Sequence, residues 1–161
     1  MFLARITDIR DCMTKLLSGD TFDRFCLVEA AIRMGITYHL DGHKNPDFFD
    51  SGFGDEPDPE EYCLWKDAKP YIYQIIKGRR LPLSFKIILA FPKKTVGFLV
   101  RESRCSFTAE DVEGIYLNIL FEPGNLRITT GISCRIFTLD RSLEQCVDDH
   151  VKAFLSAKGI G

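Results

Sequence analysis

The sequence predicts an α+β protein in which antiparallel sheets carry short helices on one side. Three observations support this fold class: apolar residues alternate in several segments, these segments come in pairs separated by turn residues, and apolar residues at helical spacing occur between the pairs. The 161 residues are 45% hydrophobic and 27% charged, which are ordinary values for one globular domain. We therefore expect a single domain over residues 1–161, with more strand than helix.

The first 41 residues predict a strand, a helix and a hairpin. The opening "MFLARIT" alternates along the chain as expected of a half-buried strand. Asp8 can accept hydrogen bonds from the free N–H groups at a helix start, and Gly19 supplies the left-handed residue that ends a helix over residues 9–18. The stretch "DRFCLVEAAIRMGITYHLDG" then predicts two strands that turn near Gly35.

Residues 42–61 interrupt this pattern. The stretch "GHKNPDFFDSGFGDEPDPEE" is rich in glycine, proline and acidic residues and predicts a loop. Its acidic residues do not match the EF-hand calcium template, because glycines stand where oxygen ligands are needed. Phe48, Phe49 and Phe53 are expected to dock on the protein or on a partner, because exposed aromatic rings are unfavourable in water.

A second strand, helix and hairpin are predicted over residues 62–101. The first of these residues can form a short strand, and a helix over residues 68–77 follows with Pro70 in its first turn. The alternation in "SFKIILAFPKKTVGFLV" predicts a hairpin that turns at residues 92–95. Residues 1–41 and this unit are then expected to be two related halves.

Residues 114–158 predict a third hairpin and a carboxy-terminal helix. The Pro-Gly pair at 123–124 suits the central positions of a type II turn, and Gly131 is expected to mark a bulge. Ser142 and Gln145 have the spacing of a capping box before apolar residues at helical spacing.

Composition excludes several classes of protein. Lys and Arg total 21 against 23 Asp and Glu, a net charge of −2, so any basic binding site must be local. Charges in the opening residues interrupt the apolar region that a secretory signal needs, and no apolar stretch is long enough to cross a bilayer. Six cysteines without a CxxC pair indicate reduced thiols rather than disulfides or a zinc knuckle. We therefore expect a cytoplasmic protein that is not integral to a membrane.

Basic residues gather around the end of the second predicted helix, in "IIKGRRLPLSFKIILAF". Lys77, Arg79 and Arg80, with Lys69 two turns earlier, are candidates for binding the phosphates of nucleic acid. The alternative is that these cations complement the partial negative charge at a helix carboxyl end, which stabilises a helix by about 0.3–1 kcal/mol each. Phosphate sites more often use helix amino ends and Gly-rich loops, which favours the alternative.

Residues with catalytic or metal-binding chemistry form no recognisable motif. His39 and His43 flank Asp41, but on a strand that runs into a loop this spacing does not hold both imidazoles on one face as a helix does, so we predict no metal site. A G-x-S-x-G elbow, a Walker loop and a dinucleotide fingerprint are absent from the sequence, so no catalytic residue and no cofactor is predicted. The favoured function is a non-enzymatic module that binds an unidentified protein or self-associates. The alternative is an enzyme whose site is not visible in the sequence.

Two long stretches carry a resemblance to a family. "LWKDAKPYIYQIIKGRRLPLSFK" and "TTGISCRIFTLDRSLEQ" resemble a family of small uncharacterised bacterial proteins that is known only as a domain of unknown function. The resemblance covers nearly the whole chain. It implies no activity and no site residue.

The order of elements over residues 1–126 is similar to the repeated strand–helix–strands plan of a DNA sliding-clamp domain, whose helices line the ring. The chain departs from clamps in its acidic loop and its added carboxy-terminal helix, and clamp rings contain more domains. The resemblance implies a clamp-like fold. It also implies a further alternative function, weak and sequence-independent binding of nucleic acid, to which Arg10 and Lys15 of the first helix would contribute.

Overall fold

One antiparallel sheet organises the chain. The computed structural model describes residues 1–49 and 60–161, with Phe49 described by its backbone alone. The strands are β1 (Leu3–Arg5), β2 (Cys26–Arg33), β3 (Thr37–Asp41), β4 (Ser84–Ala90), β5 (Val112–Glu122) and β6 (Asn125–Cys134). Within the described residues they form a six-stranded sheet in the order β1-β6-β5-β4-β2-β3, in which every neighbouring pair is antiparallel.

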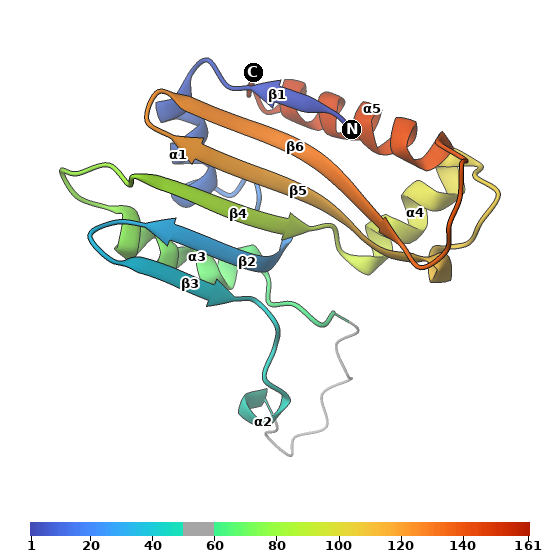
Figure 1. The fold of residues 1–161 in the computed structure, drawn as a ribbon, viewed down its shortest axis with the longest axis horizontal. Coiled ribbons are helices and arrows are strands. Elements are labelled where there is room, and N and C mark those ends of the chain that lie inside the picture. The colour runs from blue at the N-terminus through green and yellow to red at the C-terminus, as the bar shows by residue number, and fades with distance from the viewer. Residues whose placement is uncertain (50–59) are drawn as a thin grey trace.

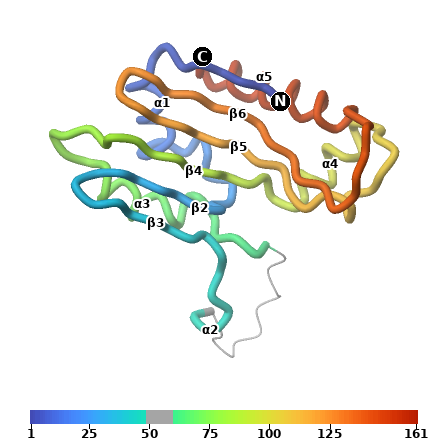
Figure 2. Tube along the Cα trace, in the orientation of Figure 1, coloured from blue at the N-terminus to red at the C-terminus, as the bar shows by residue number. Residues whose placement is uncertain are grey.

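Helices cover one face of this sheet and leave the other face open. The α-helices are α1 (Ile9–Leu17), α2 (Pro46–Phe49), α3 (Trp65–Ile76), α4 (Lys93–Ser103) and α5 (Ser142–Ala157). Figure 1 shows α1, α3, α4 and α5 behind the sheet. Figure 2 shows, in the same orientation, the trace of the strands in front of these helices. The predicted α+β class, with helices on one side of an antiparallel sheet, is confirmed.

The alternation of buried and exposed residues explains why the two faces differ. In β5, Ile115, Leu117 and Ile119 are buried beneath the helices, whereas the intervening Tyr116 and Asn118 point to the other face and are half-buried. A sheet with one face in the core and one face in water has this pattern. The alternation of residues in the strands therefore determines which side chains lie on the open face.

Several predicted elements are confirmed. Helix α1 begins after Asp8, whose carboxylate accepts the backbone N–H of Asp11 at 3.0 Å. The β2–β3 hairpin turns at the predicted position, and the β5–β6 hairpin has Gly124 with a φ of 76°, as a type II turn requires. The bulge predicted at Gly131 is wrong, because the register of the β5–β6 pair shifts near Gly114 instead.

The second predicted hairpin is wrong. The chain leaves β4 at Pro92 and forms helix α4, where a second strand was expected. The same residues carry both periodicities: Val96, Phe98 and Val100 alternate as in a strand, whereas Val96, Leu99 and Val100 have helical spacing. Phe98 is exposed and the other three are buried, so tertiary packing selects the helix. The second unit therefore has a helix where the first unit has a strand.

The short strand predicted before helix α3 is also wrong. Tyr62 and Leu64 make only isolated bridges, with His43 and Cys26 respectively, and α3 already begins at Trp65. Pro70 consequently lies inside the helix rather than in its first turn. Because of these two changes the described residues are 36% helical and 31% strand, and the expectation of more strand than helix is wrong.

The start of α5 differs from the predicted capping box. Ser142 is the first helical residue, and the backbone N–H of Ser142 donates to the carboxylate of Asp140 at 2.9 Å. Asp140 also accepts the backbone N–H of Ser106 at 2.7 Å, which ties the loop after α4 to the start of α5. These hydrogen bonds, above all those from Ser142, hold the pKa of Asp140 well below its usual range.

Replacing Asp140 with asparagine is expected to destabilise the protein at neutral pH and to reduce its sensitivity to acid. The folded state depresses the pKa of Asp140, so this carboxylate contributes stability above the ordinary pKa of about 3.9 and loses it as the pH falls further. Urea unfolding at about pH 7 and about pH 3 measures the free energy of unfolding of wild type and of Asp140→Asn. The control is Glu102→Gln, which changes an exposed carboxylate on helix α4. A stability difference between wild type and Asp140→Asn that stays constant between the two pH values would contradict the prediction.

Candidate binding surface on the open sheet face

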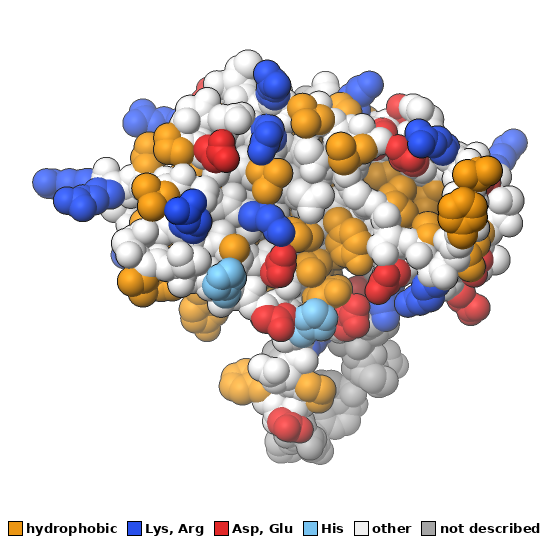
Figure 3. Space-filling view, viewed as in Figure 1, with side chains coloured by type: hydrophobic (Ala, Val, Ile, Leu, Met, Phe, Trp, Pro, Cys, Tyr) orange, Lys and Arg blue, Asp and Glu red, His pale blue; other side chains and the backbone are white. Residues whose placement is uncertain are grey.

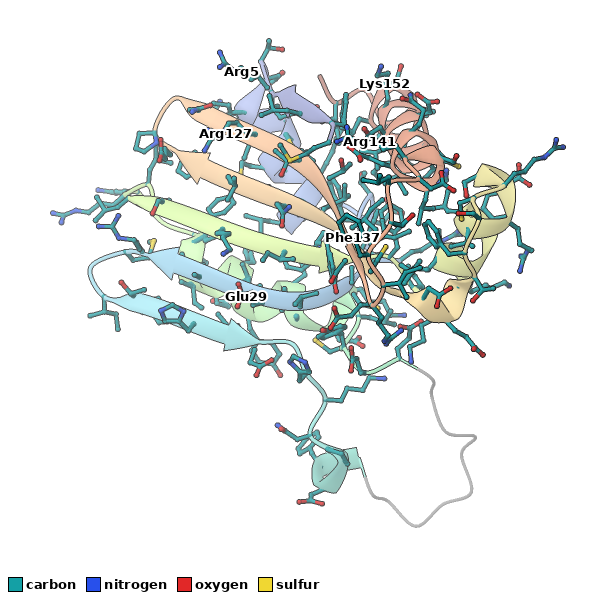
Figure 4. All side chains as sticks on the ribbon, turned by 45° about the vertical axis from the view of Figure 1, so that its right-hand side comes forward. Arg5, Glu29, Arg127, Phe137, Arg141 and Lys152 are labelled. Atoms are coloured by element: carbon teal, nitrogen blue, oxygen red, sulfur yellow. The ribbon has the colours of Figure 1, made fainter. Side chains whose placement is uncertain are left out.

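Three cations lie in one row across the open face of the sheet. The register pairs Arg5 of β1 with Arg127 of β6, Arg127 with Leu120 of β5, and Leu120 with Lys86 of β4. All four side chains point away from the helices, because their neighbours along each strand are buried or, for Ala4 of β1, packed against the core. Figure 4 labels Arg5 and Arg127 on their adjacent strands. Neighbouring strands are about 4.8 Å apart, so the row from β1 to β4 is about 14 Å long.

The charges in this row have little compensation. Arg5 stands directly opposite Arg127, and like charges at such positions destabilise a sheet. Neither guanidinium has a hydrogen bond or ion pair with any residue that the structure describes. Lys86 has one carboxylate near it, that of Glu29 on β2, at 3.5 Å with both side chains about half exposed. We call Arg5, Arg127 and Lys86 the basic row.

The positions around the basic row are partly apolar. Leu120 lies inside the row, and the next row across the sheet places Leu3 of β1 and Ile88 of β4 on the same face, with Thr129 of β6 and Asn118 of β5 between them. Leu3 is exposed, and Leu120 and Ile88 are half-buried. Figure 3 shows Lys and Arg side chains scattered over this face with hydrophobic side chains between them. The surface therefore combines separate positive charges with apolar and uncharged polar side chains.

Three of the predicted phosphate ligands lie at the end of the sheet near the basic row. Lys77 ends helix α3, and Arg79 and Arg80 are exposed in the loop that leads into β4. The backbone N–H of Leu83 donates to the carbonyl of Arg33 at 2.8 Å, which fixes this loop beside the end of β2. Their role in nucleic-acid binding stays a prediction.

Lys69 lies elsewhere and has internal partners. Its ammonium group donates to the Asp23 carboxylate at 2.6 Å and to the Gly19 carbonyl at 2.8 Å, and its side chain is 14% exposed. Lys15, on the adjacent helix α1, similarly contacts Asp11 at 2.6 Å. Helices α1 and α3 pack together, and Lys69 joins α3 to the loop after α1, whereas the ion pair of Lys15 lies within α1. On the open face, by contrast, Arg5 and Arg127 have no such partners among the described residues.

The aromatic residues of the predicted acidic loop are only partly placed. Residues 46–49 form the short helix α2 inside the segment that was predicted as a loop, and Phe48 on it is 83% exposed. The side chain of Phe49 and all of Phe53 lie outside the described residues. Partner binding by these three phenylalanines stays a prediction.

A cavity of about 350 Å³ opens at the opposite end of the sheet. Its polar lining includes Tyr62, Tyr116, Glu61 and Glu113, and its apolar lining includes Phe91 and Val96. The Ser133 hydroxyl donates to the Glu113 carboxylate at 2.6 Å. Burial, followed by the charge of Glu61, raises the pKa of Tyr62 to about 12, and burial with the nearby Glu113 also raises the pKa of Tyr116. Both phenols are thus hydrogen-bond donors at neutral pH.

Among the described residues, His43 and Asp41 lie beside Tyr62, which lines this cavity, but they do not complete a catalytic group with it. His43 Nδ1 lies 2.6 Å from the Asp41 carboxylate, and the His43 ring contacts that of Tyr62 with 4.6 Å between centroids. The hydrogen bonds from His43, first from its backbone N–H, lower the pKa of Asp41. Tyr62 is protonated and Cys63 has a pKa raised by burial, so neither is an activated nucleophile beside this pair. Over residues 1–49 and 60–161 no group of three potential metal ligands comes together.

All six cysteines are free thiols, as predicted. Burial raises the pKa of Cys12 to about 11 and also raises the pKa of Cys63, Cys134 and Cys146. Thiols of this kind are poor nucleophiles at neutral pH. They pack as small apolar side chains.

The basic row was not found by sequence reasoning. Its members are far apart in the chain, and their alignment depends on the register of four strands. A partial signal was present, because each cation stands at a polar position of an alternating strand. That signal places a residue on the open face, but it does not place the three residues side by side.

The fold and this surface define an α+β protein with one open, locally basic sheet face. Comparison with protein families shows that the chain belongs to DUF5721, a family of unknown function, whose model matches residues 15–161. Comparison with curated proteins and with solved structures gave no match. Among the helices that the structure describes, none has the length and apolar character needed to cross a membrane.

Proposed function

We propose that the protein is a cytoplasmic, non-enzymatic binding module that holds single-stranded nucleic acid on the open face of its sheet. The observation that carries this proposal is the basic row, in which Arg5 and Arg127 face each other without a carboxylate between them. Such a pair costs stability in the free protein. A bound anion removes that cost, so the row favours a ligand with phosphate groups.

The shape of the surface favours a single strand over a duplex. Proteins that bind single strands combine cations for the phosphates with aromatic side chains on which the bases stack, and on this face the apolar side chains beside the cations are aliphatic. Here Leu120 and Ile88 supply an apolar ground next to the cations. A duplex keeps its bases inside and would leave this ground uncovered.

The remaining charges support weak, local and sequence-independent binding. Arg79 and Arg80 extend the cationic surface past the start of β4, whereas Glu29 beside Lys86 limits it on the other side. The total charge of −2 adds no long-range attraction. Affinity should therefore depend on a few phosphate contacts and fall steeply with salt.

Neutralising two members of the row is expected to abolish most of this binding. Lys86→Gln/Arg127→Gln removes two cations from the open face, and each lost phosphate contact should lower the slope of log affinity against log salt by about 0.7 for a single strand. Fluorescence anisotropy with labelled oligothymidine and oligouridine over a salt series measures both affinity and slope. The matched control is Lys66→Gln/Lys94→Gln, which removes two exposed lysines from the helix face.

Two results would overturn the proposal. One is equal binding by the two double variants, and the other is no binding by wild type at low salt. A duplex of the same length, measured alongside, should bind more weakly than the single strand. Circular dichroism of each variant establishes that the fold is retained.

A further inference from the structure

Strand β3 ends the sheet with an unpaired edge. The backbone N–H of Gly42 donates to the Val28 carbonyl and that of Met34 to the Ile36 carbonyl, and hydrogen-bonded positions alternate along an antiparallel pair. Tyr38 and Leu40 therefore direct their backbone groups to β2. Thr37, His39 and Asp41 direct theirs outward, where no described strand lies.

Among the described residues this edge has little of the usual protection against pairing. Sheet edges are normally shielded by charged residues, especially lysine, by proline, a bulge or a very short strand, or by a helix or loop that covers them, and β3 has one charged residue, Asp41. The five residues of β3, "TYHLD", contain neither lysine nor proline, and the β2–β3 ladder has no register shift. The opposite edge, β1, has three residues and ends in Arg5. The two edges of one sheet thus differ, and β3 is the one that can accept another strand.

We propose that a second copy of the chain pairs with β3 through its own β3, in an antiparallel ladder centred on His39. Centring on His39 brings all three outward-facing residues of each strand into register: His39 faces His39 of the second copy, and Thr37 faces Asp41 of the second copy. A twofold axis perpendicular to the sheet relates the two strands, so the contact is closed and self-complementary. The pairing itself does not depend on the proposed function.

The side chains at this edge suit a second copy. Arg33 pairs with Thr37 inside one copy, and Thr37 faces Asp41 of the second copy, so the Arg33 side chain can reach that carboxylate along the open face. The same contact repeats on the other side of the axis. The Arg33 side chain has no hydrogen bond or ion pair with any residue that the structure describes. Asp41 is exposed, with its Oδ1 already engaged by the backbone N–H and the Nδ1 of His43, so the guanidinium would meet the other oxygen of this carboxylate. The charges are therefore complementary across the interface.

Exposed apolar side chains flank the same edge. Ile36 is 67% exposed in the β2–β3 turn. Helix α2, which carries the exposed Phe48, follows the Asp41 end of β3 and extends beyond the edge (Figure 1). In the antiparallel arrangement the Asp41 end of one strand lies beside the turn of the other copy. Burial of these side chains would add to the main-chain hydrogen bonds.

The pairing would align the two binding surfaces, a consequence that rests on the proposed function. The basic row continues through Ala31 of β2 to His39, which occupies the same row on β3. His39 opposite its symmetry mate therefore joins the rows of both copies into one line on one continuous face. A single strand of nucleic acid could then contact both rows.

The proposed pairing is tested by variants of His39. His39→Lys places a lysine opposite its symmetry mate, and His39→Pro removes an outward N–H without breaking the β2 ladder. Sedimentation over a concentration series is expected to show a monomer–dimer equilibrium for wild type and monomer for both variants. Ser156→Lys, on the exposed surface of α5, is the control and should behave as wild type.

Amide hydrogen exchange adds a readout specific to the edge. Protection of the Thr37, His39 and Asp41 amides should rise with protein concentration, whereas Tyr38 and Leu40 are protected at every concentration. Wild type that sediments as a monomer throughout, or a dimer that persists in both His39 variants, would overturn the pairing.

Different variants test nucleic-acid binding and dimer formation, so either proposal can be contradicted without the other. Lys86→Gln/Arg127→Gln should still dimerise while losing nucleic-acid binding. His39→Pro, which adds no charge to the row, should bind oligothymidine as a monomer with a shorter footprint. A monomeric His39→Pro protein that loses all binding would overturn the proposal that a single copy holds the nucleic acid.

Discussion

Replacing Trp65 with alanine is expected to lower the free energy of unfolding by about 3–5 kcal/mol. Trp65 is fully buried at the start of α3, and its ring fills the space between α3 and α1. Its indole N–H donates to the carbonyl of Leu16 at 3.0 Å. That carbonyl lies in the last turn of α1, where helix carbonyls have no partner within the helix. The Trp65 side chain thus fills space in the core and also donates a hydrogen bond to a carbonyl at the end of α1.

Urea unfolding followed by circular dichroism measures this change, since Trp65 is the sole tryptophan of the sequence and fluorescence is lost with it. Trp65→Phe separates the two contributions, because it keeps most of the ring and leaves the Leu16 carbonyl without its donor, at a cost of about 1–3 kcal/mol. Tyr71→Ala, on the same helix and 69% exposed, is the matched control and should change stability by less than about 0.5 kcal/mol. Equal effects of Trp65→Ala and Tyr71→Ala would contradict the prediction.

A single methyl group at Gly42 is expected to cost about 1–3 kcal/mol or more. A Cβ at this position would stand 1.7 Å from the Leu27 carbonyl oxygen and 2.5 Å from its carbon. Both are backbone atoms, so no side chain can turn away to make room. Gly42 also donates to the Val28 carbonyl and accepts from the Cys63 N–H, both at 2.8 Å, so its own backbone is held in place.

Thermal or urea unfolding of Gly42→Ala compared with Gly35→Ala measures the effect of the close approach. Gly35 lies in the β2–β3 turn, and a Cβ there meets nothing within 4 Å. Its substitution should be nearly neutral. If Gly42→Ala unfolds at the same urea concentration as wild type, the tight crossing of residues 27 and 42 does not exist in solution.

Local signals in the sequence were sufficient for most elements of the fold. Helix α1 follows from Asp8 and its apolar spacing, and the β2–β3 and β5–β6 hairpins follow from alternation and turn residues. Residues 93–103 were mispredicted because they satisfy two periodicities at once. Which of them is used depends on contacts with α5 and β5, and these are contacts between distant segments.

The candidate surface could be predicted only in part for a similar reason. Alternation tells which residues leave the core, so Arg127 and Lys86 could be placed on an exposed face. Their side-by-side arrangement requires the strand order, in which β4 lies between β5 and β2. Lys69 shows the opposite case: its chemistry suits a phosphate, but its partner Asp23 comes from a loop whose position no local pattern reveals.

The pairing of β1 with β6 has a consequence for how the chain reaches its native state during synthesis. Phe2, just before β1, donates its N–H to the Thr130 hydroxyl, 128 residues further along the chain, and Figure 2 shows the two segments side by side. At about 5–20 residues per second a ribosome needs roughly 6–25 s to make the intervening chain. Until then the edge of β6 that receives β1 does not exist, and the first strand must wait unpaired. Closing so long a loop is slow, so the docking of β1 should be among the last steps of folding.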